Sequence, residues 1–209
     1  MKKVLKKMIE ANLKFVVFLL NKNNIGRFIL EELNKNILNK KKIIVYKDLN
    51  LKFYTPNRLS QYRIDTFSTK EPETLEWIDK FEKKTTFWDI GANIGLYSCY
   101  AAKRNECYVY AFEPSIFNLE WLGRNILLNN LVEKITVIPI ALTEAISKNT
   151  LNFSTTEWSG ALTTFGQTYT HDGKILDEVF KLSTLGVSMN DAKNLLKVPQ
   201  PNYIKIDVD

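Results

Sequence analysis

The feature that most constrains this chain is a glycine-containing turn between two short apolar runs. The first run ends at Asp89, the turn carries Gly91 and Gly95, and the second run, residues 108–112, ends directly before Glu113. A helix-like segment separates the two runs. In a βαβ unit of this layout, the turn and the helix N-terminus approach a ligand, and the acid after the second strand binds ribose hydroxyls. The pattern therefore predicts a nucleoside-binding unit.

The spacing of the turn narrows the kind of nucleoside. Dinucleotide sites use Gly-x-Gly-x-x-Gly, in which the second glycine lets the backbone approach a pyrophosphate. Asn93 occupies that second position here, so a diphosphate fits poorly and a phosphate-free nucleoside fits better. Glu113 follows Gly91 by about the 20 residues expected of a ribose-binding acid. A nicotinamide-dependent oxidoreductase remains the less favoured alternative.

Several further motifs follow in a characteristic order. They are Asp89–Ser98, Ala111–Ser115, Asn125, Asn129, Asn130, Pro139–Leu142 and Tyr203–Asp209. As an ordered set over residues 71–209, they resemble the FkbM family of class I methyltransferases. The resemblance implies S-adenosylmethionine as cofactor and methyl transfer to an oxygen of a small-molecule or glycan acceptor. A non-catalytic binding module that keeps the cofactor fold is the other alternative.

The expected fold class is α/β, with a Rossmann-like, doubly wound and mostly parallel sheet. Its predicted core strands are residues 85–90, 108–112, 135–138 and 203–208, alternating with helices. The family's strand order, 3-2-1-4-5-7-6, places the last of these strands in the middle of the sheet. We therefore expect a C-terminally truncated domain, incomplete after the fourth core strand, which puts the activity of this chain in question.

The resemblance also implies site residues. The expected cofactor-binding residues are Asp89, Gly91, Ala92, Asn93, Gly95, Glu113, Pro114, Ala141 and Leu142. Asp89 and the Gly91 backbone would meet the methionine portion of the cofactor, and Glu113 the two ribose hydroxyls. The alternatives stay open: both glycines suit packing at any strand-to-helix turn, Asn93 can bond its own turn, and Ala141 and Leu142 suit a core.

Asp207 is the candidate catalytic residue, because it ends a central strand where ligands of open α/β sheets bind. A hydroxyl acceptor must lose a proton, which a carboxylate within hydrogen-bond reach can take. A structural role is the alternative. Asp207 and Asp209 lack a third carboxylate, so no metal site is predicted. The single histidine, His171, reads as a residue of an exposed loop.

The charge of the chain is unevenly distributed. Residues 1–42 hold 11 Lys and Arg against three acidic residues, whereas the rest holds 18 against 20. The near-neutral body lacks the basic stripe of a nucleic-acid site. The N-terminal segment reads as amphipathic helices with a break at Asn21–Asn24, because its apolar run is too short for a span and has no cleavage site. A helix covering the domain edge is favoured over a membrane-surface anchor.

Two domains are expected, a lead-in of basic helices and short strands over residues 1–70 and the Rossmann-like domain over residues 71–209. Strand-like runs occupy residues 42–54 and 60–67 of the lead-in. A short added strand at residues 151–153 precedes a long Ser/Thr/Gly-rich stretch, residues 154–173, which favours a binding loop over disorder. The two cysteines lack disulfide or metal spacing, which suits a reducing cytoplasm.

Overall fold

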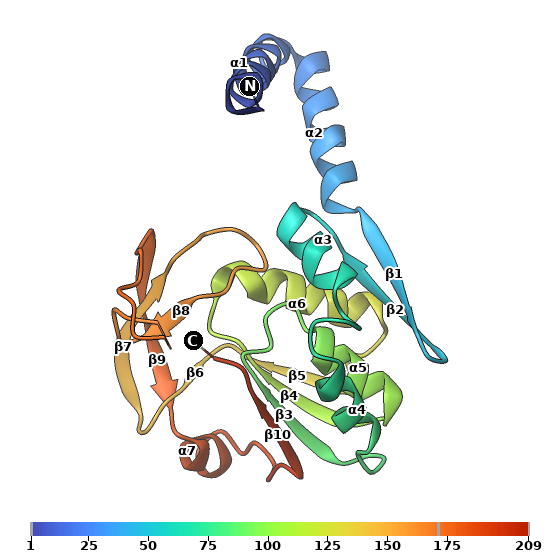
Figure 1. Cartoon of the computed structure of the whole chain (residues 1–209), viewed down its shortest axis with the longest axis vertical. Helices are drawn as coiled ribbons and strands as arrows, with labels where there is room; N and C mark the ends of the chain where they lie inside the picture. The colour runs from blue at the N-terminus through green and yellow to red at the C-terminus, as the bar shows by residue number, and fades with distance from the viewer. Residues whose placement is uncertain (1, 171, 209) are drawn as a thin grey trace. The chain divides into compact units, whose positions relative to one another are not determined.

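The computed structural model describes residues 2–170 and 172–208, in two compact units, Met1–Lys40 and Lys41–Asp209. The first unit holds α1 (Lys2–Leu20) and α2 (Asn24–Leu38), separated by the predicted break (Figure 1). A Cβ on Gly26 would lie 2.0 Å from the carbonyl oxygen of Leu20, so the close approach of the two helices requires glycine. Among the described residues, the structure contains no helix with the length and apolarity to span a membrane.

The second unit is built on a four-stranded parallel sheet in the order β10-β3-β4-β5. Its strands are β10 (Tyr203–Ile206), β3 (Thr86–Ile90), β4 (Tyr108–Phe112) and β5 (Ile135–Ile138). The crossover helices are α5 (Leu96–Arg104) and α6 (Ile116–Leu128) (Figure 1). Strand β10, the last in the chain, lies beside β3, the first core strand, as expected. The prediction of an α/β fold with a parallel sheet is confirmed.

Both faces of this sheet are covered, because alternate residues of each strand point to opposite sides. On one face, Phe87 packs edge-on against Phe81, just after α4 (Pro72–Asp79). On the other face, Trp88 and Phe112 share a buried cluster with Ala192 of α7 (Met189–Asn194). The sheet is therefore doubly wound.

A second sheet, in the order β6-β9-β7-β8, flanks the first. Its strands are β6 (Ala141–Leu142), β7 (Ser147–Phe153), β8 (Thr163–Phe165) and β9 (Phe180–Val187). The short strand predicted at residues 151–153 is the end of the longer strand β7. The stretch 154–173 is not a structureless loop, because it contains β8, which pairs antiparallel with β7. Strand β9, in which half of the residues are exposed, was not predicted from the sequence.

The strand expected at residues 60–67 is wrong: residues 58–65 form helix α3 (Arg58–Asp65). The side chain of Asn57 accepts a hydrogen bond from Ser60 N at 2.8 Å and so caps this helix. The preceding hairpin of β1 (Lys41–Tyr46) and β2 (Leu49–Tyr54) is antiparallel. Asn125 of α6 and Asn129, directly after this helix, accept hydrogen bonds from the backbone of β2. Residues 41–70 therefore lie in the same compact unit as the parallel sheet, and a domain start at residue 71 stays a prediction.

Candidate functional site

Three cavities meet at the bend after β3, and Gly91 lines all of them. One, of about 40 Å³, lies beside Tyr97 and Asp207. The second, of about 200 Å³, lies beside Glu113. The third, of about 570 Å³, reaches from Pro114 to the second sheet. Together they form a hollow at the carboxyl ends of parallel strands, where open α/β sheets bind ligands. The third cavity alone has a volume typical of small-molecule sites.

Gly91 shapes this bend through its backbone. Its φ is +82°, and a Cβ would lie 2.0 Å from the carbonyl oxygen of Asp207 on the neighbouring strand. The N–H groups of Gly91 and Ala92 both donate to the carbonyl of Phe112, at 2.9 and 3.0 Å. Glycine is required here because a side chain would collide with backbone. Ala92 lines the smallest cavity.

The Glu113 carboxylate lies at the end of β4, in the wall of the 200 Å³ cavity. Its Oε2 accepts from the N–H of Asn93 at 2.7 Å, and its Oε1 accepts from the N–H of Ser115 at 2.9 Å. The side chain is 5% exposed, and this burial raises its pKa to about 7. Two backbone donors thus fix an acidic group at the end of β4, and its contact with a ribose stays a prediction.

The side-chain oxygen and the side-chain nitrogen of Asn93 each form a hydrogen bond within the protein. Its Oδ1 accepts from the N–H of Ile94, within its own turn, at 3.0 Å. Its Nδ2 donates to the carbonyl of Gly160 at 2.7 Å, and Asn118 Nδ2 donates to the same carbonyl at 3.2 Å. Asn93 also lines two of the cavities, so its bond within the turn leaves room for a ligand contact.

Asp89 and Gly95 lie behind the cavities, and neither lines any of the three. Asp89 is buried, accepts from Ser98 Oγ at 2.5 Å through Oδ2, and its Oδ1 has no hydrogen-bond partner among the described residues. Burial raises the pKa of this carboxyl. Gly95 begins α5 with a φ of +83°, and a Cβ would lie 2.6 Å from Leu122. A side chain at position 95 would thus crowd α6, and direct contact of Asp89 or Gly95 with a ligand stays a prediction.

Asp207 faces two of the cavities, next to a buried cation. Lys205, which is 9% exposed, donates from Nζ to Asp207 Oδ2 at 2.9 Å and lies opposite Asp89 in the β10–β3 register. Partial burial opposes ionisation of Asp207, but the hydrogen bond and charge of Lys205, with Lys70 and Arg63 nearby, hold its pKa below the usual range. Asp207 is therefore an ionised carboxylate at neutral pH.

Pro114, Ala141 and Leu142 line the 570 Å³ cavity. Ala141 and Leu142 form β6, which pairs with β9 and starts the second sheet. Leu142 also packs against the buried cluster that contains Trp88 and Phe112. These two residues thus serve both the core and a cavity wall, which were alternatives in the sequence.

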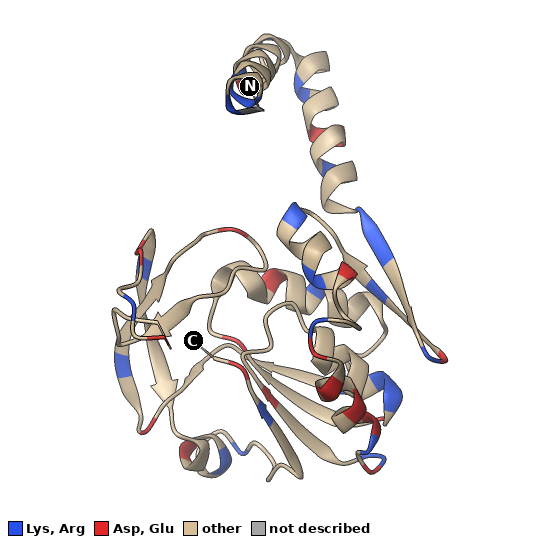
Figure 2. Ribbon diagram, in the orientation of Figure 1, with Lys and Arg blue, Asp and Glu red and all other residues tan. Residues whose placement is uncertain are grey.

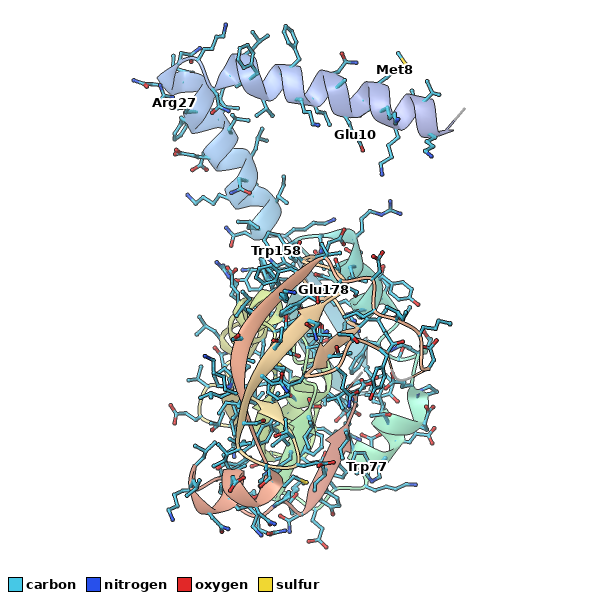
Figure 3. The ribbon with its side chains drawn as sticks, turned by 90° about the vertical axis from the view of Figure 1, so that its left-hand side faces the viewer. Met8, Glu10, Arg27, Trp77, Trp158 and Glu178 are labelled. Atoms are coloured by element: carbon cyan, nitrogen blue, oxygen red, sulfur yellow. The ribbon has the colours of Figure 1, made fainter. Side chains whose placement is uncertain are left out.

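The sequence analysis missed Arg63 and Lys70, which each line two cavities. Arg63 belongs to α3, and its Nε donates to the carbonyl of Ser159 at 2.7 Å. These residues lie outside the motifs of the βαβ unit, and the path of residues 58–70 brings them to the site. Trp158, in the neighbouring segment, packs edge-on against Trp121 and so anchors that segment (Figure 3 labels Trp158).

Comparison with known proteins gives a family and several distant structures. The model of the methyltransferase FkbM domain matches residues 89–209. TYW2 of P. horikoshii, solved in complex with MeSAdo, is 19% identical with a TM-score of 0.38, covering 49% of this chain and 36% of that chain. TYW2 of M. jannaschii, in complex with AdoMet, is 21% identical with a TM-score of 0.36, covering 47% and 42%.

A SAM-dependent methyltransferase of Agrobacterium tumefaciens is 14% identical with a TM-score of 0.38, covering 49% of this chain and 33% of that chain. The chain thus matches less than half the length of each of these three structures. No curated protein matches it. The family match spans more than half of the sequence and contains the Gly91 bend, Glu113 and Asp207, and the chain therefore belongs to the FkbM family of methyltransferases.

Proposed function

We propose that this chain binds S-adenosylmethionine and transfers its methyl group to a hydroxyl of a small molecule or glycan. The observation that carries the proposal is the buried Glu113 carboxylate, fixed by two backbone donors in the hollow around Gly91. Ribose hydroxyls are donors, so a carboxylate at this place suits a nucleoside. When bound, the cofactor supplies a methyl group on a sulfonium sulfur.

The walls of the hollow fit the parts of such a cofactor. Pro114, Ile140 and Leu142 provide an apolar surface for the adenine beside the Glu113 carboxylate. Gly91 keeps side-chain atoms away from the bend. Asp89, two residues earlier, has a buried Oδ1 without a hydrogen-bond partner in the described part of the chain. Arg63 and Lys70 offer positive charge for the methionine carboxylate. No phosphate is needed to explain any of these groups.

Asp207 positions the acceptor in this proposal. Methyl transfer is a displacement in line with the acceptor oxygen, so alignment is the main task of the protein. Because Lys205 occupies Oδ2 of Asp207, the other carboxylate oxygen is available to accept the proton of an acceptor hydroxyl. The acceptor class, and oxygen as its reacting atom, come from the family resemblance.

Titration calorimetry with S-adenosylhomocysteine tests the cofactor assignment. We expect binding by the full chain and a loss of at least about tenfold in affinity in Glu113→Ala, because a charge-assisted hydrogen bond pair is removed. Glu120→Ala is the matched control, since Glu120 pairs with Arg124 on the surface of α6. A folded chain that binds no S-adenosylhomocysteine would favour the non-catalytic module, and quenching of NADH fluorescence would favour an oxidoreductase.

Transfer of a labelled methyl group to a panel of sugars, small alcohols and small amines tests the acceptor. We expect product only from hydroxyl compounds, slowed about 100-fold or more in Asp207→Asn with unchanged affinity for S-adenosylhomocysteine. Product from amines alone would overturn the assignment of oxygen.

A further inference from the structure

Helix α1 presents two distinct faces along its 19 residues. At 100° per residue, Lys3, Lys7, Glu10 and Lys14 recur every three or four positions and share one face. The remaining, wider face is mostly apolar and carries Asn12 near its centre. Figure 3 shows Met8 and Glu10 pointing to opposite sides of the helix. This is a basic amphipathic helix with a broad apolar side.

The apolar side chains of α1 are exposed. Val4, Leu5, Met8, Ile9, Leu13, Phe15, Val16, Phe18 and Leu19 are each 44% to 64% accessible. Among the described residues of the first unit, only Gly26 in α2 is buried, so the two helices do not cover this face for each other. A contiguous apolar surface of this kind marks an interaction site.

The net charge of the first unit indicates which kind of surface the apolar face of α1 contacts. Residues 1–40 carry nine Lys and Arg against three Glu, and Figure 2 shows blue, basic segments at the start of α1. Two copies of this unit would bring like charges together, whereas an anionic surface would attract the lysines that border the apolar face. Helices with Lys on one side and Phe and Leu on the other lie along lipid headgroups.

We propose that α1 docks this protein onto an anionic lipid surface. The helix lies in the plane of the interface, with Met8 and Phe15 among the apolar side chains that insert, and with its lysines at the headgroups. This inference does not rest on the proposed function, because docking requires neither cofactor nor acceptor.

Flotation of the full chain with vesicles tests the docking. We expect binding to mixed phosphatidylcholine–phosphatidylglycerol vesicles and at least about tenfold weaker binding to pure phosphatidylcholine, with the difference shrinking at high salt. Binding that ignores lipid charge and salt, or no binding to either vesicle, would overturn the proposal.

Matched variants separate lipid docking from other uses of the face. Met8→Gln with Phe15→Gln removes two exposed apolar side chains, and we expect at least about tenfold weaker flotation. Val17→Gln is the control, because Val17 lies on the lysine-bearing side and should change little. All four tryptophans lie beyond residue 41, so their emission checks the second unit separately, while circular dichroism checks helix content.

Two outcomes would show that the apolar face of α1 contacts protein and not lipid. If the wild-type chain forms a dimer without lipid that the double variant dissociates, the face joins copies of this chain. If the double variant instead lowers the melting temperature of the second unit and flotation is unchanged, the face packs within the protein. Either result overturns the lipid assignment.

Discussion

The N–H of Asn93 donates to Oε2 of Glu113 at 2.7 Å, and this bond joins the loop after β3 to the end of β4. The two residues are 20 positions apart in the sequence. The bond orients the buried carboxylate whether or not a ligand is present. The protonation state of Glu113 therefore matters for stability as well as for binding.

Glu113 makes stability depend on pH. Its folded-state pKa, about 7, lies above its ordinary value of 4.5, so the folded chain holds the proton more tightly than the unfolded chain. This contribution is fully present below about pH 4.5 and is lost as pH rises through 7. Between pH 5 and pH 8 we expect the free energy of unfolding to fall on the order of 1–3 kcal/mol more in the wild type than in Glu113→Gln. Urea denaturation at several pH values measures this difference, and parallel pH profiles would contradict it.

Replacing Gly91 by alanine tests the close approach of β3 and β10. Gly91→Ala combines a positive φ with a Cβ only 2.0 Å from a backbone oxygen. Gly173→Ala is the matched control, because its φ is +77° and no atom lies within 4 Å of the added Cβ. We expect Gly173→Ala to cost about 1–2 kcal/mol from backbone strain alone, and Gly91→Ala to cost about 2 kcal/mol more. Equal losses in thermal unfolding would show that β10 can move away without cost.

Lys205→Met tests the charge balance between β3 and β10. The substitution keeps the length of the side chain but leaves Asp89 without its nearest cation. We expect a loss of about 1–3 kcal/mol at pH 7, because Asp89 loses a favourable charge and Asp207 loses a charged hydrogen bond. The loss should shrink as pH falls, because burial raises the pKa of Asp89 and the protonated carboxyl needs no counter-charge. A loss that does not change with pH would mean that Lys205 stabilises the strand pair by packing alone. Surface variant Lys80→Met controls for removal of one positive charge.

The sequence predicted the parallel sheet well because its strands are bounded by clear signals. Gly91 and Gly95 end β3, and Glu113 and Pro114 end β4, so the order of strand, turn and helix follows from local chemistry. Helix α3 was missed because its apolar residues also fit a strand, and the capping role of Asn57 decides between the two.

The second sheet depends on pairing between distant residues. Leu151 lies opposite both Phe165 and Leu182, and no local sequence pattern predicts that pairing. In the candidate site, the motif residues Gly91, Asn93 and Glu113 line one cavity, and their binding of a cofactor stays a prediction. The partner of Asn93, the carbonyl of Gly160, lies 67 residues away and has no side chain to mark it. Sequence spacing could not reveal that contact.

The carbonyl of Gly160 carries a practical consequence for redesign. It accepts from Asn93 after β3 and from Asn118 on α6, while the adjacent carbonyl of Ser159 accepts from Arg63. Loop grafting between β7 and β8 would thus disturb the wall of the candidate site even when no grafted residue lines a cavity. A redesign of this segment should keep the orientation of the Ser159–Gly160 peptide and exchange residues only on either side of it.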